Sequence, residues 1–368
     1  MKFSCGATVL AEGLKRVAGA LPSRTINPVL EGVKVECSDN AVKLTCSDEL
    51  TTIVTEFAAK VDEAGAGIVP GKLFGEVVRG LGDTEVSVAM NERFAFAVRG
   101  AGSRTNLSGQ DAALYPELPR IEDEHAVRLP QWTLKQMIKK TAFSVATEDM
   151  REVLTGALLR FESGTATMVG LDGFRMAMCK VNTSCDVDDC SAIIPGKALN
   201  DLSKLLTDAD GAFVEIRIGG GKLAASVDGT EFYATLINGE YINYTAIIPK
   251  TAQTKVRVET GALRRAVDRA GLIARQGNNN LVVIRIDDDG MTLEASSPIG
   301  DMRESVQAEV YGDSIKIAFN VKYMFDVLRN ADCDEIELRM NGAISPCTVT
   351  PVGSDDVLYL VLPVRTAQ

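Results

Sequence analysis

The sequence predicts an α+β fold made of three tandem copies of one domain, each with two helices packed on antiparallel sheets. A helix, turn and strand pattern recurs about every 125 residues, a second helix opens each copy, and a hairpin pattern lies between the two helices. The period is too long for a solenoid of repeats of about 20–50 residues. We expect the copies at 1–124, 125–252 and 253–368.

The recurring helix is marked by Lys72, Lys197 and Lys322, which are each 125 residues apart. Apolar residues first recur at helical spacing and then alternate with polar residues, as in a strand. The three segments are VPGKLFGEVVRGLGDTEVSVAM (69–90), IPGKALNDLSKLLTDADGAFVEIRI (194–218) and FNVKYMFDVLRNADCDEIELRM (319–340). This pattern predicts helices over 71–81, 196–206 and 320–330.

The helix that opens each copy is predicted by apolar stripes over 7–24, 130–145 and 259–277. Apolar and polar residues then alternate around a turn of Ser, Asp, Asn or Gly, which predicts hairpins at 32–46, 156–170 and 281–295. The first two copies match further, because Asp48 and Asp172 lie 124 residues apart. Each copy is expected to end in a strand with a tyrosine followed by a proline, at 115–120, 244–250 and 359–365.

The overall composition limits the classes of function. The 39 lysines and arginines against 50 acidic residues give a net charge of −11, which argues against a protein that coats nucleic acid by phosphate neutralisation alone. Apolar runs such as LVVI at 281–284 are far shorter than the ~18 residues of a membrane span. The first residues, MKFSCGATVLAEGLKR, lack the long apolar stretch of a signal peptide. We therefore expect a cytoplasmic protein that contacts no membrane.

The charge is distributed unevenly along the chain. Segments 7–24, 131–147 and 259–277 carry +2, +3 and +2, and the other three predicted helices carry +1 each. The predicted helices thus total +10 and the remaining residues −21. This segregation favours helices that face a polyanion and strands that face solvent. The good helix propensity of lysine and arginine is an alternative explanation, and the two remain open at this point.

No arrangement of residues typical of an enzyme is found. The eight cysteines form no CxxC pair, and the single histidine, His125, has no local partner for catalysis. CDVDDC (185–190) has the residue types for a cation, but we interpret it as a solvated loop. The PGK tripeptides lack the spacing of a phosphate-binding loop and mark helix starts, whereas IGGGK (218–222) and DDDG (287–290) are predicted turns. We expect no catalysis, no metal and no cofactor.

Several segments resemble those of bacterial DNA sliding clamps, the beta subunits of DNA polymerase III, over the whole chain. They are MKF (1–3), VLTG (153–156), LDGFRMA (171–177), GEYINYTAIIPK (239–250), FNVKYMFDVL (319–328) and YLVLPVR (359–365). The resemblance implies a head-to-tail homodimer whose six similar domains form a ring around double-stranded DNA, with helices lining the hole. Such a ring would act by topology, without reading bases, and would confer processivity on a polymerase.

The resemblance also implies a surface that faces DNA. Arg24 matches a loop arginine that touches DNA in this family, and the other candidates are basic residues of the predicted helices. An ordinary solvated helix residue is the alternative for each. The candidates are Arg24, Lys72, Lys139, Lys140, Lys197, Arg265 and Arg269.

A second implied site is a shallow apolar pocket that accepts short peptides from the DNA polymerase III alpha subunit, the clamp loader, other polymerases and repair proteins. Apolar anchors would fill it, while Arg175 and Arg365 would supply polar contacts at its edge. For several of these residues, membership of an ordinary core is the alternative. The pocket residues are Leu154, Leu171, Gly173, Phe174, Arg175, Met176, Ile242, Ile247, Pro346, Val361, Leu362, Pro363, Val364 and Arg365.

The chain departs from the common pattern of the family at this pocket. Leu171 and Phe174 stand where threonine and histidine are frequent, and Ile242 and Ala246 stand where proline and arginine are frequent. We expect a pocket that is more apolar and less charged, with partner peptides that differ in detail.

The implied dimer interface joins the first domain of one subunit to the third domain of the other. Leu107, Leu272 and Ile273 match apolar positions there, whereas Thr105 replaces a position that is often aromatic. An oligomeric scaffold that never encircles DNA would share the repeats, but it would not need positive helices. Salt-dependent association with DNA distinguishes the two functions.

Overall fold

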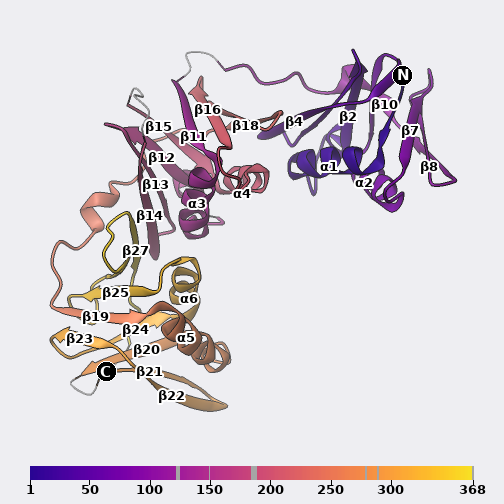
Figure 1. Ribbon diagram of the computed structural model, residues 1–368. Coiled ribbons are helices and arrows are strands. Elements are labelled where there is room, and N and C mark those ends of the chain that lie inside the picture. Colours follow the sequence, from indigo (N-terminus) through magenta and orange to yellow (C-terminus); the bar gives the residue numbers. More distant parts are fainter. Residues whose placement is uncertain (122–124, 149, 184–188, 278–279, 288–289, 367–368) are drawn as a thin grey trace. The chain divides into compact units, whose positions relative to one another are not determined.

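The computed structural model describes residues 1–121, 125–148, 150–183, 189–277, 280–287 and 290–366 (Figure 1). They form two compact units. The first unit contains Met1–Leu134 and Lys197–Leu236, and the second contains Lys135–Gly196 and Ile237–Gln368. The three predicted domain boundaries therefore stay a prediction, since each unit combines segments from more than one repeat.

Six α-helices occur in the described residues, and each coincides with a predicted helix. Apolar residues at helical spacing explain them, as in the first helix, where Leu10, Leu14 and Val17 are all buried. The helical segment ends at Ala20, earlier than predicted, because Leu21 precedes Pro22 and takes the extended conformation that is favoured before proline. The helices are α1 (Ala7–Val17), α2 (Gly71–Gly80), α3 (Gln131–Thr141), α4 (Gly196–Leu205), α5 (Thr260–Ala274) and α6 (Val321–Asn330).

Short 3-10 helices continue or replace several turns of the chain. They are η1 (Ala18–Ala20), η2 (Pro28–Glu31), η3 (Ala112–Leu114), η4 (Ala142–Ser144), η5 (Glu152–Thr155) and η6 (Tyr244–Ile247).

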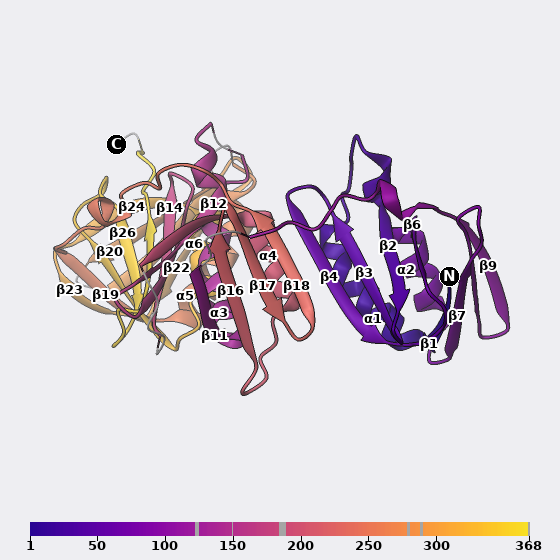
Figure 2. The same ribbon diagram turned by 90° about the horizontal axis from the view of Figure 1, so that it is seen from above.

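The first unit holds two antiparallel sheets, and α1 packs on β3 and β4 of the larger one (Figure 2). The smaller sheet has the order β5 (Lys60–Glu63), β1 (Lys2–Gly6), β7 (Glu85–Met90), β8 (Ala95–Gly100), β9 (Ser103–Ser108). The larger sheet has the order β10 (Gln110–Asp111), β6 (Gly65–Pro70), β2 (Gly32–Ser38), β3 (Ala41–Ser47), β4 (Thr51–Ala58), β18 (Thr230–Thr235), β17 (Lys222–Val227), β16 (Phe213–Gly219), β11 (His125–Pro130).

The second unit repeats this arrangement of one smaller and one larger sheet, with α5 packed on β20, β21 and β22. The smaller sheet has the order β22 (Gly300–Val306), β21 (Gly290–Ser297), β20 (Leu281–Asp287), β24 (Ile315–Asn320). The larger sheet has the order β15 (Cys190–Pro195), β12 (Gly156–Glu162), β13 (Thr165–Leu171), β14 (Arg175–Asn182), β27 (Val357–Val361), β26 (Cys347–Pro351), β25 (Glu335–Met340), β19 (Thr254–Glu259), β23 (Glu309–Gly312).

Each larger sheet runs across a repeat junction. In the first unit β4 of the first repeat pairs with β18 of the second, with Thr55 opposite Thr230 (Figures 1 and 2). The hydroxyls of those two threonines are 3.0 Å apart and buried. In the second unit β14 of the second repeat pairs with β27 of the third, with Arg175 opposite Val361. Main-chain hydrogen bonds therefore join successive repeats.

The predicted hairpins form, and their turns explain the residues found there. Asp39 and Asn40 both have positive φ, of 48° and 61°, and Ser163 and Gly164 have φ of 49° and 74°. Two consecutive positive φ angles are typical of the tight type I′ turn, which Asn, Asp and Gly tolerate best. The third turn, in DDDG, includes residues 288–289, which lie outside the described residues, as do residues 185–188 of CDVDDC.

The predicted strand at the end of each repeat is wrong for two repeats. Only Tyr359 lies in a strand, β27, whereas Tyr244 lies in η6 and Tyr115 follows η3 in an irregular segment. Pro116 and Pro119 have no N–H to donate to a sheet, which explains the irregular backbone. All three tyrosines are buried, so the recurring Tyr-Pro signal reports side-chain burial and not a strand.

Candidate functional site

The predicted pocket residues all belong to the second unit, and several of them form one buried cluster. Leu154, Leu171 and Met176 are fully buried and pack with Leu360, and Ile242 covers this cluster in a half-buried position. Val361 is also fully buried, in β27. These residues form the support of the site and not its open surface.

The exposed apolar members of the predicted pocket are Phe174, Ile247, Leu362 and Val364, called the apolar patch below, and each keeps at least a third of its surface open. The backbone holds three of them in place. The N–H of Leu362 donates to the carbonyl of Phe174 at 2.8 Å, and the N–H of Val364 donates to the carbonyl of Ala318 at 2.8 Å. Ile247 lies in η6, whose Tyr244 packs into the buried cluster. Exposed apolar side chains on a fixed backbone favour the binding of apolar groups.

A tight turn presents Phe174 to solvent. The Asp172 side chain accepts hydrogen bonds from the N–H groups of Phe174 at 2.9 Å and Arg175 at 3.0 Å. Gly173 has a φ of +85°, which glycine adopts without strain. The Phe174 ring stacks on Tyr323 of α6, with 5.8 Å between ring centroids.

Tyr323 lies in the helix predicted over 320–330, and no sequence pattern indicated its place beside Phe174. Burial raises the pKa of its hydroxyl, and nearby Asp172 raises it further, which outweighs the opposite effect of Arg175. Tyr323 is therefore neutral at ordinary pH. The ring on which Phe174 stacks is therefore uncharged, although Asp172 and Arg175 lie near it.

Arg175 does not lie at the edge of the patch as expected, and this prediction needs correction. Its side chain is only 8% exposed. It donates to Asp172 at 3.0 Å, to Asp326 at 2.6 Å and to the carbonyl of Phe143 at 2.8 Å. The guanidinium also lies 4.8 Å from the Tyr323 ring centroid. A buried arginine with these partners ties the chain together and offers little to a ligand.

The remaining pocket residues lie near the exposed patch. Pro346 and Pro363 are half-buried beside the ends of β26 and β27, and Arg365 is exposed beyond Val364. Of the two predicted pocket arginines, Arg365 is thus the one that is open to solvent. Gly173 is exposed in the turn before Phe174.

The basic candidates divide according to their partners. Arg24, Lys72 and Lys140 have no ion pair within the described part of the chain. Arg24 lies beyond the end of η1 and is exposed, and Lys72 is exposed in the first turn of α2. Each of the six described helices keeps a net positive charge. These residues can attract an anion without first breaking a contact.

Four other basic candidates have acidic neighbours. Ion pairs join Lys139 to Asp332 at 3.6 Å and Arg265 to Glu259 at 3.7 Å. Arg269 donates from Nε to Glu304 at 2.9 Å. Lys197 contacts Asp48 at 2.8 Å and Asp201 at 2.9 Å. Exposed ion pairs contribute little to stability, so the first three can exchange partners readily.

The candidate interface residues differ in exposure. Leu107 lies in the edge strand β9 but is buried in its own unit, so it offers little apolar surface to a partner. Leu272, near the end of α5, is largely exposed, and the adjacent Ile273 is half-buried. The strands β9 and β22 end their sheets and have unpaired backbone edges within the described residues.

Within the described residues, no group of three or more His, Cys, Asp or Glu side chains is placed to hold a metal ion. Among the same residues, none of the helices has the length and apolar character needed to cross a membrane.

Comparisons with known proteins connect these features to one family. Residues 1–119, 128–243 and 245–365 match the N-terminal, central and C-terminal domains of the DNA polymerase III beta subunit. The beta sliding clamp of Staphylococcus aureus is 33% identical over 376 residues, with both chains fully covered.

Solved structures agree with the sequence matches. The DNA polymerase sliding clamp of Bacillus subtilis is similar with a TM-score of 0.95 and 31% identity, and both chains are fully covered. The sliding clamp of Pseudomonas aeruginosa bound to griselimycin is similar with a TM-score of 0.93 and 26% identity, again over 100% of both chains. The expected order of three tandem clamp domains is confirmed.

Proposed function

Because the chain belongs to the DNA polymerase III beta subunit family, we propose that it is a DNA sliding clamp, a non-catalytic factor that gives processivity to the replicative polymerase. The match of all three repeats, in order and over the whole chain, carries this proposal. The clamp acts where bacterial DNA is replicated, in the cytoplasm. The domain limits 1–124, 125–252 and 253–368 form part of the proposal.

The clamp works by encircling duplex DNA as a head-to-tail homodimer. A closed ring cannot leave the duplex sideways, so strong or base-specific contacts are unnecessary. Positive helices attract phosphates regardless of sequence, and this attraction weakens as salt rises. The open edges of β9 and β22, together with exposed Leu272, support an interface between the first repeat of one subunit and the third repeat of its partner.

The DNA-facing surface is best represented by Arg24, Lys72 and Lys140, because these residues are not paired within the described part of the chain. Lys139, Arg265 and Arg269 contribute after exchanging their acidic neighbours for phosphate. If Lys72 contacts one phosphate, Lys72→Ala lowers the slope of log affinity against log salt by about 0.9. Titration of duplex DNA at several salt concentrations measures this slope.

The apolar patch is the docking surface for the DNA polymerase III alpha subunit, the clamp loader, other polymerases and repair proteins. Phe174, Leu362 and Val364 offer apolar contact, and Arg365 offers a charged contact at the edge. The griselimycin complex of the Pseudomonas aeruginosa clamp supports a ligand-binding surface in a clamp of this fold.

The decisive experiment separates the clamp from an oligomeric scaffold that does not encircle DNA. The protein is loaded on circular plasmid by a competent clamp loader with ATP, and the DNA is then linearised at moderate salt. Retention on the circle and loss from the linear form support topological linkage. Equal release from both forms, or no loading, contradicts the clamp function and favours the scaffold.

A further inference from the structure

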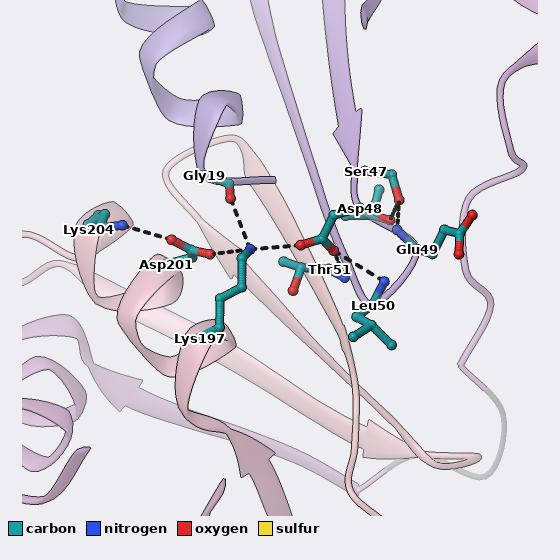
Figure 3. A network of polar contacts seen from close by, with 10 residues as sticks. Gly19, Ser47, Asp48, Glu49, Leu50, Thr51, Lys197, Asp201 and Lys204 are labelled. Carbon is teal, nitrogen blue, oxygen red and sulfur yellow. Dashed lines mark hydrogen bonds and ion pairs between the residues drawn. The ribbon is translucent and has the colours of Figure 1, made fainter. Parts of the chain in front are cut away.

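Lys197 occupies a site with three acceptors at the junction between the first two repeats (Figure 3). Its ammonium group lies 2.8 Å from Asp48 and 2.9 Å from Asp201, and it donates to the carbonyl of Gly19 at 3.2 Å. Gly19 and Asp48 belong to the first repeat, whereas Lys197 and Asp201 belong to α4 of the second. One cation therefore joins two segments of the first repeat to a helix of the next.

The junction between the second and third repeats has the same set of acceptors. Arg175 donates to the carbonyl of Phe143, to Asp172 and to Asp326. The two carbonyls, at 19 and 143, are 124 residues apart, as are Asp48 and Asp172, whereas Asp201 and Asp326 are 125 apart. These offsets are those of the repeat itself, so the acceptors are equivalent by position.

The turn that carries the first aspartate is also repeated. Asp48 accepts hydrogen bonds from the N–H groups of Leu50 at 3.2 Å and Thr51 at 2.7 Å. Asp172 accepts from the corresponding N–H groups of Phe174 and Arg175. The source of the central cation differs, because Thr51 is the positional equivalent of Arg175. A lysine from α4 fills the site in one junction, and an arginine from β14 fills it in the other.

The polar groups of the Lys197 site contact one another and leave few hydrogen-bond donors or acceptors for another ligand. Asp201 is only 5% exposed, and Lys204 contacts its second oxygen at 2.8 Å. Two nearby carboxylates removed from water need a cation, since burying an uncompensated charge is costly. An ammonium group has three N–H donors, and the three acceptors use all of them.

The charge of Lys197 is secured by these contacts. Partial burial lowers the pKa of its ammonium group, but hydrogen bonds to Asp48 and Asp201 outweigh burial and leave the pKa above its usual value. Lys197 is therefore a cation at any ordinary pH.

We propose that each junction between repeats in this chain is held by one cation in a repeated three-acceptor site, with Lys197 as the positioning residue of the first junction and not a DNA contact. The proposal goes beyond clamp activity, because it concerns how the repeats are joined and holds without DNA. It also accounts for the difference between Lys197 and its positional equivalent Lys72, which has no ion pair among the described residues.

Hydrogen exchange of the full-length protein tests the proposal, with Lys72→Ala as the matched control. Lys197→Ala is expected to speed exchange of amides across the β4 and β18 pair about tenfold, the effect of losing charge-assisted hydrogen bonds to partly buried acceptors. Lys72→Ala should leave these amides unchanged. In DNA titrations the salt slope should fall for Lys72→Ala and stay the same for Lys197→Ala. A lower salt slope with unchanged exchange in Lys197→Ala overturns the proposal.

A rescue variant tests whether the two acceptor sets are equivalent. Thr51→Arg, added to Lys197→Ala, places a guanidinium at the position that Arg175 has in the other junction, and slow exchange should return. Exchange that is as fast as in Lys197→Ala, or faster, in a folded double variant contradicts the equivalence.

Thr51 is only 2% exposed, so the larger arginine side chain can prevent the rescue variant from folding. A double-mutant cycle that introduces no larger side chain is therefore measured as well. Lys197→Met and Asp48→Asn are combined, and exchange of the same amides is measured. The two effects should be less than additive, because either change removes the same contact. Strict additivity overturns the proposal even if the rescue variant does not fold.

Discussion

Removing the Phe174 side chain should weaken peptide binding without unfolding the protein. The ring is 58% exposed, and it stacks on the ring of Tyr323. The turn around Asp172 is held through the main chain, so it does not depend on the ring. Phe174→Ala therefore removes binding surface and little of the core.

The size of the effect follows from the open area. A phenylalanine side chain can bury about 200 Å², so 58% exposure leaves roughly 120 Å² available to a ligand. Burial of apolar surface is worth about 25 cal/mol per Å², which gives about 3 kcal/mol if a peptide covers all of it. Coverage of half the area gives about 1.5 kcal/mol, or a roughly tenfold higher Kd. Loss of the stack costs the fold about 0.5–1.5 kcal/mol.

Isothermal titration with a short peptide that carries leucine and phenylalanine anchors measures the change in Kd. Trp132→Ala is a matched control, since Trp132 is a similarly exposed aromatic residue in the first unit. Its Kd should equal that of the unchanged protein. An unchanged Kd for folded Phe174→Ala would refute the assignment of the apolar patch as the docking surface.

Three further predictions concern stability and thiol chemistry. Arg175→Met leaves Asp172 and Asp326 without their cation and should destabilise the second unit by about 3–5 kcal/mol in urea unfolding, whereas exposed Arg365→Met should not. Burial raises the pKa of Glu337, but hydrogen bonds from Arg339 and Arg257 outweigh it and lower the pKa below 4.5. Its stabilising effect is thus present above pH 4.5 and lost as the pH falls through the folded-state pKa, so Glu337→Gln should flatten the acid side of a plot of melting temperature against pH. Burial, aided by the Glu85 charge, raises the pKa of Cys5 to about 11, so iodoacetamide should alkylate it slowly at about pH 8, and Glu85→Gln should speed the reaction measured by mass spectrometry.

The repeat made most of the fold predictable from sequence. Lys72, Lys197 and Lys322 located three helices, and the hairpin turns at Asp39–Asn40 and Ser163–Gly164 followed from local turn chemistry. Two of the three Tyr-Pro segments were misassigned, because a buried tyrosine gives the same sequence pattern in a strand and in an irregular segment. Backbone conformation there depends on prolines and on the fold around them.

The site was less predictable, since exposure depends on contacts between distant segments. Phe174 and Arg175 are neighbours, yet the Asp172 turn leaves Phe174 exposed, whereas Arg175 is buried in contact with Asp326 and the carbonyl of Phe143. Asp326, the partner of Arg175, lies 151 residues away, and Asp48 and Lys197 are also far apart in sequence. No local pattern signals such partners. The offset between Asp48 and Asp172 was visible in the sequence, but the sequence did not show that each aspartate contacts a cation.

The sheets that cross repeat junctions also constrain how the chain can fold during synthesis. β4 ends at Ala58 and its partner β18 begins at Thr230, so roughly 170 residues must be translated between them. At about 5–20 residues per second, β4 waits on the order of 10–30 s with one edge unpaired. The strand reads TTIVTEFA, which is rich in β-branched residues and prone to pair with any free strand. A nascent chain on the ribosome therefore passes through an interval of aggregation risk that ends only when the second repeat has emerged.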